Sequence, residues 1–207
     1  MFVKKVVSNL LKSETVLKNE PVIVYVNKFN EEAAKKFSED MGKAQLTGQH
    51  VIPVVIDSYG GAVYSLTSMV STIKASEVPV ATIVLGKAMS CGTALASCGA
   101  EGMRFCSPDA TYLIHDVSSW AVGKIEEMKV STKEAKRLDK MLYTMMSRNC
   151  GQKDDYFKKL SRKKRGADWF FTPKEAKKHN LANHICIPKM TVSVDVNFEF
   201  HNCDEDK

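Results

Sequence analysis

The sequence lacks the features typical of membrane proteins, disulfide-rich scaffolds and disordered chains. No apolar run approaches the roughly 20 residues that span a bilayer, and the first residues lack the apolar core and cleavage site of a secretory signal. The six cysteines include no Cys-x-x-Cys pair, so neither a zinc ribbon nor a thioredoxin-type motif is expected. Glycine and proline number only 11 and 6, which excludes collagen and low-complexity sequence. We therefore expect a cytoplasmic protein with reduced thiols and no membrane partner.

The residues that are present are those of an ordinary globular chain. Hydrophobic residues make up 44% of the 207 positions, so the chain can bury a core without disulfides. The 30 Lys and Arg against 24 Asp and Glu give a net charge of +6, which suggests acidic partners only weakly. The densest basic run, residues 158–165, has no interleaved aromatic residues. We interpret it as a solvated helix face and expect no nucleic-acid partner. Neither a cofactor nor a metal site is expected in this chain.

Strands alternate with helices along the chain, which predicts an α/β fold. Short β-branched runs indicate the strands, and apolar residues at helical spacing indicate the helices. The expected strands are Val22 to Val26, Val51 to Ile56, Val80 to Leu85 (ended by Gly86), Arg104 to Cys106, Thr111 to His115 and Val192 to Phe200. The expected helices follow the cap Asn30, begin at Ala62, and cover Cys91 to Ala100, Lys124 to Cys150, Lys153 to Lys164 and, after the cap Thr172, Pro173 to His179. The apolar stripe of the longest helix is Leu138, Met141, Leu142 and Met145.

Two glycine-bearing turns each stand between a strand and a helix. Residues 57–61 are Asp-Ser-Tyr-Gly-Gly, and residues 86–92 are Gly-Lys-Ala-Met-Ser-Cys-Gly. Ser90, at the end of a strand and among small residues, can present its hydroxyl as a nucleophile. The backbone N–H groups of Gly61 and Cys91 are candidates for holding an oxyanion. A glycine turn that only packs tightly is the competing interpretation of each segment.

A serine nucleophile needs a base, and the base needs a group that orients it. Among five histidines, His115 ends an apolar strand, a rigid position that suits a site residue, whereas His179 is expected at a helix surface. A purely structural histidine is the competing interpretation of His115. Asp168 is a candidate for the orienting carboxylate. Three other aspartates are candidates as well, and spacing does not choose among them: Asp57, Asp109 and Asp116.

Four segments together match the pattern of one enzyme family. Residues 57–61 are similar to its Asn-Ser-Pro-Gly-Gly turn, and residues 86–92 to its Gly-Gln-Ala-Ala-Ser-Met-Gly elbow. Residues 104–115 are similar to its Arg-Phe-x-x-Pro…Ile-His segment, and residues 168–176 to its Asp-Arg-Phe-(Leu/Met)-Ser…Glu-Ala segment. From about Val22 to Ile187 the chain thus resembles ClpP, the proteolytic subunit of the ATP-dependent Clp protease.

This resemblance implies both a fold and a reaction. The fold would be crotonase-like (ClpP-like), built from repeated ββα units with a long handle helix from Lys124. Ser90 would be the nucleophile, His115 the general base and Asp168 the orienting carboxylate, with the N–H groups of Gly61 and Cys91 as the oxyanion hole. The activity would be that of a serine endopeptidase on unfolded polypeptides.

The resemblance also implies an assembly and a division of the chain. The protein would form a homo-oligomeric ring of seven, single or stacked in two, fed by an AAA+ unfoldase that alone uses ATP. Residues 1–20 would be an N-terminal arm, 21–187 the peptidase domain, and 188–207 a C-terminal strand and polar tail.

The chain departs from the family pattern near the expected site. Residues 116–123 replace the family's glycine-rich strand, which holds substrate and helps rings to lock, and Ala167 stands where the family often has Arg. Such departures suit a specialised, for instance virus-encoded, member. Two alternatives stay open: a catalytically inactive or latent subunit acting in assembly, and a crotonase-fold enzyme acting on acyl-thioesters. Within the site, Cys91 as nucleophile and Lys87 as the base of a Ser–Lys pair are minor alternatives.

Overall fold

The computed structural model describes residues 20–118, 124–163 and 168–191 of the 207-residue chain. Apart from Glu20, the N-terminal arm expected for residues 1–20 lies outside these ranges. The strand and tail expected from Val192 onward, Ala167 and residues 119–123 lie outside them as well.

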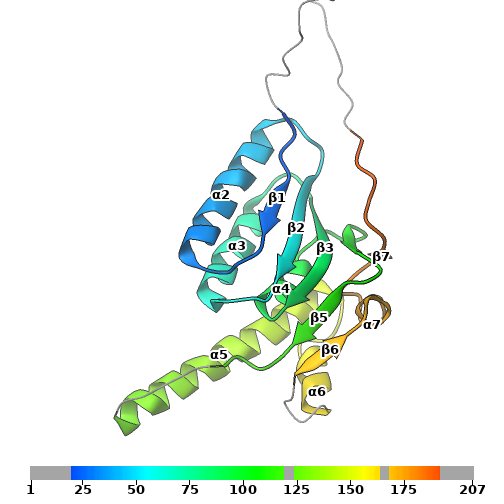
Figure 1. The fold of residues 1–207 in the computed structure, drawn as a ribbon. Helices are drawn as coiled ribbons and strands as arrows, with labels where there is room; N and C mark the ends of the chain where they lie inside the picture. Colours follow the sequence, from blue (N-terminus) through cyan, green and yellow to red (C-terminus); the bar gives the residue numbers. More distant parts are fainter. Residues whose placement is uncertain (1–19, 119–123, 164–167, 192–207) are drawn as a thin grey trace, which may run out of the picture.

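A single sheet organises the described residues, as expected for an α/β chain (Figure 1). Its path runs β1-β2-β3-β4-β7, while β5 pairs with β3 and β6 pairs with β5. The pairings are parallel except between β5 and β6, which are antiparallel. The strands are β1 (Val24–Val26), β2 (Ile52–Ser58), β3 (Val80–Met89), β4 (Arg104–Cys106), β5 (Thr111–Ile114), β6 (Trp169–Phe171) and β7 (His184–Ile185).

The helices begin close to where the sequence places them, because their caps are local signals. The Asn30 side chain accepts a 2.8 Å hydrogen bond from the N–H of Ala33, and Thr172 forms a reciprocal capping box with Glu175. The helices are α2 (Glu31–Leu46), α3 (Val63–Ala75), α4 (Cys91–Ala96), α5 (Ile125–Asn149), α6 (Tyr156–Lys163) and α7 (Pro173–Lys178).

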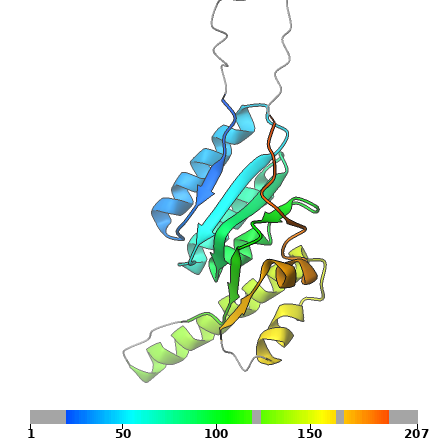
Figure 2. The same cartoon turned by 45° about the vertical axis from the view of Figure 1, so that its right-hand side comes forward.

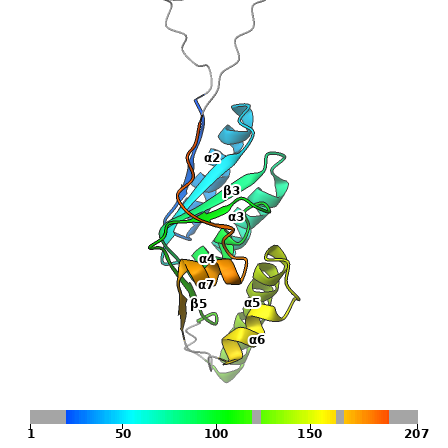
Figure 3. The ribbon, with the colours of Figure 1, turned by 90° about the vertical axis from the view of Figure 1, so that its right-hand side faces the viewer.

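The core lies between the sheet and these helices. In Figure 3, α3, α4 and α5 lie on the same side of the sheet, and α4 contacts β3, α3 and α5. Only the C-terminal part of α5 packs there, and its N-terminal half extends away from the sheet (Figures 1 and 2). The completely buried side chains of this core include Val24, Met41, Ile56, Leu66 and Val84.

One expectation about these elements is wrong, and a second is right only in part. Gly86 does not end its strand: β3 continues to Met89 because it changes partner, pairing with β4 at Thr82–Val84 and with β5 at Lys87–Met89.

The apolar stripe expected in α5 is confirmed at Leu138, which is buried, and at Leu142 and Met145, which pack half-buried against the core. The stripe did not include Tyr143, which is also buried. Its hydroxyl donates a hydrogen bond to Asp116, which permits this burial.

Candidate active site

Ser90 occupies a strained turn between β3 and α4. Its φ of 56° and ψ of −118° are rare for a residue with a side chain, and such strain concentrates at functional sites. The Ser90 N–H donates to the carbonyl of Leu113 at 2.9 Å. The hydroxyl of Thr93 lies 2.8 Å from the same carbonyl and 2.6 Å from that of Ala88. These contacts fasten the turn to β5, the strand that leads into His115.

His115 contacts the Ser90 hydroxyl directly. It follows the last residue of β5, and its Nε2 lies 2.8 Å from Ser90 Oγ. The side chain is 30% exposed, so a substrate can reach the pair. A nucleophile within hydrogen-bond distance of a base is the basic requirement of nucleophilic catalysis by serine.

Asp168 lies on the other side of the His115 ring. β6 pairs antiparallel with β5, matching Ile114 with Trp169, and this register brings Asp168 next to His115. Asp168 Oδ1 is 3.7 Å from His115 Nδ1, which is beyond hydrogen-bond range, and the Asp168 side chain is 57% exposed. The structure therefore brings the three predicted side chains together, with Ser90 in contact with one ring nitrogen of His115 and Asp168 close to the other but not hydrogen-bonded to it.

The side chains of the other candidates for the orienting carboxylate and the base do not contact the Ser90–His115 pair. Asp57 forms an ion pair with Lys87 at 2.9 Å, and the Lys87 ammonium lies 4.5 Å from the centre of the Tyr59 ring. Asp116 points toward α5 and α6. Asp109 precedes β5 whereas His115 follows it, so the strand separates them. The geometry therefore favours Asp168 as the partner of His115 and gives Lys87 no contact with Ser90.

The glycine turn of residues 57–61 lies against Ser90. Gly60 has a φ of 104°, and a Cβ there would lie 2.8 Å from Ser90 Cβ and 3.3 Å from the Cys91 nitrogen. The Cys91 thiol donates to the Gly61 carbonyl at 3.2 Å. These contacts place the backbone of Gly61 beside the start of α4. The two predicted oxyanion donors thus belong to turns that touch each other.

Cys91 is a packing thiol rather than a nucleophile. Its side chain is buried, and burial raises its pKa to about 11 despite nearby hydrogen bonds. A thiol with a pKa in that range stays neutral near pH 7 and reacts poorly.

A small cavity of about 60 Å³ opens beside Ser90 and His115. Its apolar lining comes from Val63, Leu142 and Met146 among others, while Asp139 and Tyr143 supply polar groups. The cavity suits a small apolar group next to the serine hydroxyl.

Two side chains, His179 and Lys158, are less exposed to solvent than the sequence suggested. His179 is half-buried rather than fully at the helix surface: its Nδ1 lies 2.8 Å from the Tyr156 hydroxyl, and its ring packs edge-on against Trp169. Burial, with the charge of Lys178, lowers its pKa. Lys158, the first residue of the basic run, is not a solvated group either, since it forms ion pairs with Asp116 and Asp139. The sequence carried no signal for this Lys158 cluster, because its members come from separate elements.

The chain matches a known family over most of its length. A family model described as Clp protease covers residues 5–189. The chain belongs to the Clp protease family. This match confirms the resemblance and the ClpP-like fold. It begins at residue 5, well before the resemblance noted from Val22. In the described parts of the chain, no helix is long and apolar enough to cross a membrane.

Proposed function

We propose that this Clp protease family member is a serine endopeptidase that hydrolyses peptide bonds of unfolded polypeptides. The observation that carries this proposal is the 2.8 Å contact between His115 Nε2 and Ser90 Oγ, made at a strained turn. Asp168, close to the other ring nitrogen, supports it.

The proposed reaction is acyl transfer through Ser90. Its oxygen attacks the peptide carbonyl carbon while its proton passes to His115 Nε2, and the carbonyl electrons move onto the oxygen. The N–H groups of Gly61 and Cys91 hold this oxyanion, and each such donor is worth about 10²–10³ in rate. Collapse expels the amine, which takes the proton from His115. Water, deprotonated by His115 Nε2, then attacks the ester carbonyl carbon. Its bond to the Ser90 oxygen breaks, the peptide leaves as a carboxylic acid, and the Ser90 oxygen takes the proton back from His115.

Asp168 has an orienting role in this scheme. Its carboxylate favours the tautomer with the proton on His115 Nδ1 and stabilises the imidazolium that forms. The present separation of 3.7 Å would shorten when substrate or assembly closes the site, as is common for hydrogen bonds in ligand-free enzymes.

The proposal extends to assembly, partner and location. Clp protease subunits generally form rings that receive substrate from AAA+ unfoldases. We propose for this chain a homo-oligomeric ring of seven, single or stacked in two through α5. ATP would be used only by the partner unfoldase. The five described cysteines are free, in keeping with a reducing cytoplasm.

A latent subunit is the second candidate function. The observation that favours it is the 3.7 Å separation of Asp168 Oδ1 from His115 Nδ1, which leaves the His115 imidazolium without a hydrogen-bonded carboxylate. Such a subunit would contribute to assembly and hydrolyse peptides only in a mixed ring.

Labelling with a fluorophosphonate tests the two candidates directly. Intact mass would be measured for wild type, Ser90→Ala and the matched control Ser68→Ala, an exposed serine on α3. The peptidase proposal expects one adduct on wild type and on Ser68→Ala, and none on Ser90→Ala. Light scattering on the same samples gives the assembly state. An assembled wild-type ring that takes no label would contradict the peptidase proposal and favour the latent subunit.

A further inference from the structure

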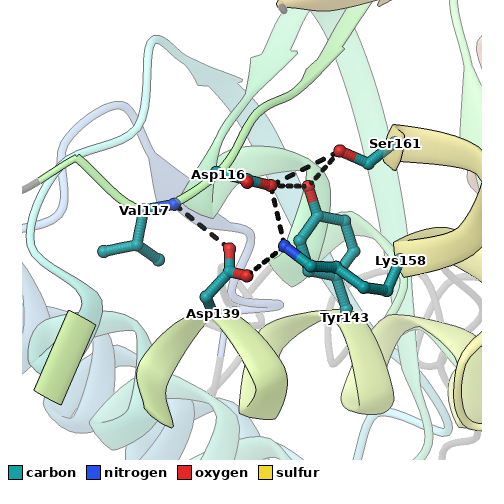
Figure 4. A network of polar contacts seen from close by, with 6 residues as sticks. All are labelled: Asp116, Val117, Asp139, Tyr143, Lys158 and Ser161. Carbon is teal, nitrogen blue, oxygen red and sulfur yellow. Dashed lines mark hydrogen bonds and ion pairs between the residues drawn. The ribbon is translucent and has the colours of Figure 1, made fainter. Parts of the chain in front are cut away.

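A cluster of charged and polar side chains contacts the two residues that follow His115 in the chain. Figure 4 shows Lys158 of α6 between two carboxylates, Asp116 and Asp139. Asp116 follows His115 in the chain, and its Oδ1 lies 3.1 Å from the Lys158 ammonium. Asp139, on α5, pairs with the same ammonium and accepts a 3.2 Å hydrogen bond from the N–H of Val117. One lysine therefore connects to the two residues that follow His115, to Asp116 directly and to Val117 through Asp139.

Two hydroxyl groups complete this cluster. The Tyr143 hydroxyl donates to Asp116 at 2.8 Å and lies 3.0 Å from the Ser161 hydroxyl. The ammonium of Lys158 also lies 4.7 Å from the centre of the Tyr143 ring. Asp116 is thus fixed by one residue of α5 and two residues of α6.

The burial of Lys158 and Asp139 separates their contact from ordinary surface ion pairs. Their side chains are only 26% and 14% exposed, whereas those of the neighbouring pair Lys159–Asp155 are 66% and 55% exposed. The Asp116 side chain is more open, with 46% exposed. Charge-assisted hydrogen bonds gain strength when water is largely excluded. Burial alone would raise the pKa of Asp116, but hydrogen bonds from Tyr143 and Lys158 outweigh it and lower that pKa. The carboxylate is therefore charged at neutral pH.

The segment from His115 to Ser118 depends on such contacts for its conformation. It follows β5 and belongs to no helix or strand. The contacts that fix it to α5 and α6 are the Asp116 side chain and the Val117 N–H. Asp139 and Tyr143 also line the small cavity beside Ser90. Any shift of this segment would move the His115 ring relative to Ser90.

We propose that Lys158 is a positioning residue for His115, acting through Asp116 and Asp139. Its ammonium pairs with both carboxylates and so holds Asp116 directly and Val117 through Asp139, the two residues that follow the imidazole in the chain. This inference rests on the proposed peptidase function, because the position of His115 matters only if it works as the base.

Lys158→Met tests the role, with Lys159→Met as the matched control on the same helix. A displacement of about 1 Å at a catalytic group costs on the order of 10²-fold in rate. We therefore expect Lys158→Met to lower kcat on a fluorogenic peptide about 10- to 100-fold, with KM within about twofold of wild type. The rate of fluorophosphonate labelling should fall by a similar factor. Lys159→Met should stay within about twofold of wild type in each measurement.

A second substitution separates positioning from a general loss of structure. Asp139→Asn keeps an oxygen that accepts from the Val117 N–H but removes one of the two negative charges that face Lys158, which would repel each other without the lysine. Added to Lys158→Met, it should restore kcat at least about threefold, because interacting residues give non-additive effects. Near-ultraviolet circular dichroism and light scattering would verify that each variant is folded and equally assembled. If Lys158→Met does not fold, Lys158→Gln takes its place with an expected loss of at least about fivefold in kcat.

The outcomes are distinct. A kcat for Lys158→Met equal to that of Lys159→Met, a change in KM alone, or no recovery on adding Asp139→Asn would overturn the positioning role while leaving the peptidase proposal intact. A wild-type protein that neither hydrolyses the peptide nor takes the label would overturn the peptidase proposal, and the positioning role with it.

Discussion

At the scale of single residues, the candidate site depends on a close approach of backbone to backbone. Gly60 has no side chain, and this lets the turn of residues 57–61 touch the Ser90 elbow. The same contact brings Gly61 beside Cys91, whose N–H is the other proposed oxyanion donor. A substitution that separates the two turns should therefore damage the site before it damages the fold.

Gly60→Ala is predicted to impair Ser90, and Gly102→Ala is the matched control. An alanine at position 60 would place its Cβ 2.8 Å from Ser90 Cβ and 2.9 Å from the Met89 carbonyl. Gly102 has a similarly positive φ of 76°, but a Cβ there would meet nothing within 4 Å, so its replacement adds backbone strain alone. Such strain costs about 1–3 kcal/mol. We expect both variants to lose stability to urea, and only Gly60→Ala to lose at least about tenfold in the fluorophosphonate labelling rate. Equal labelling rates of Gly60→Ala and Gly102→Ala would show that the close approach of Gly60 to Ser90 is not needed for the reactivity of Ser90.

Cys91 is predicted to resist alkylation although it adjoins the nucleophile. Burial raises its pKa to about 11, so below pH 9 the neutral, unreactive thiol dominates. Cys186 is exposed and provides the internal comparison. With iodoacetamide at pH 8, peptide mapping of the native protein should show modification of Cys186 and none of Cys91. Both should react after unfolding in urea. Modification of native Cys91 at the rate of Cys186 would indicate an accessible thiolate and revive Cys91 as a nucleophile.

The sequence indicated Ser90 and His115 because each sits at the end of a strand, where local pattern is informative. Spacing alone could not choose Asp168 over the other aspartates, and only the resemblance to ClpP named it. The choice depends on the pairing of β5 with β6 across more than fifty residues. Lys158 was misinterpreted for a related reason. Its neighbours Asp116 and Asp139 belong to other elements, so the basic run alone suggested a solvated face.

At the scale of elements, the sequence predicted features that depend on local signals, such as helix caps. It did not predict where a strand changes its pairing partner. Asn30 and Thr172 correctly predicted the starts of α2 and α7, because the side chain of a cap accepts a hydrogen bond from a residue only three positions further along. Gly86 suggested the end of a strand, yet β3 continues through it. Asp57 of β2 explains why glycine is there, since its Oδ1 would lie 3.0 Å from a Cβ at position 86. The glycine serves a close approach between neighbouring strands, a role that sequence pattern does not distinguish from a turn.

At the scale of the whole molecule, α5 projects from the sheet with apolar side chains exposed. Its N-terminal half extends beyond the sheet (Figures 1 and 2), and there Ile125 and Val130 are 71% and 68% exposed. Exposed apolar side chains on a projecting helix are typical of an interaction surface. In a family whose members form rings, the proposed occupant is the same helix of another copy.

Ile125→Glu with Val130→Glu is therefore predicted to reduce the size of the assembly. The double variant changes the net charge by two units and removes the exposed apolar groups. Lys133→Glu, on an exposed position of the same helix, changes the charge equally and keeps those groups. Light scattering should give a lower mass for the double variant, and the wild-type mass for Lys133→Glu. If assembly also shortens the contact between Asp168 and His115, the double variant should lose labelling of Ser90 together with mass. A smaller assembly that still labels at the wild-type rate would show that the triad closes within one subunit, and would remove the assembly requirement from the proposed mechanism.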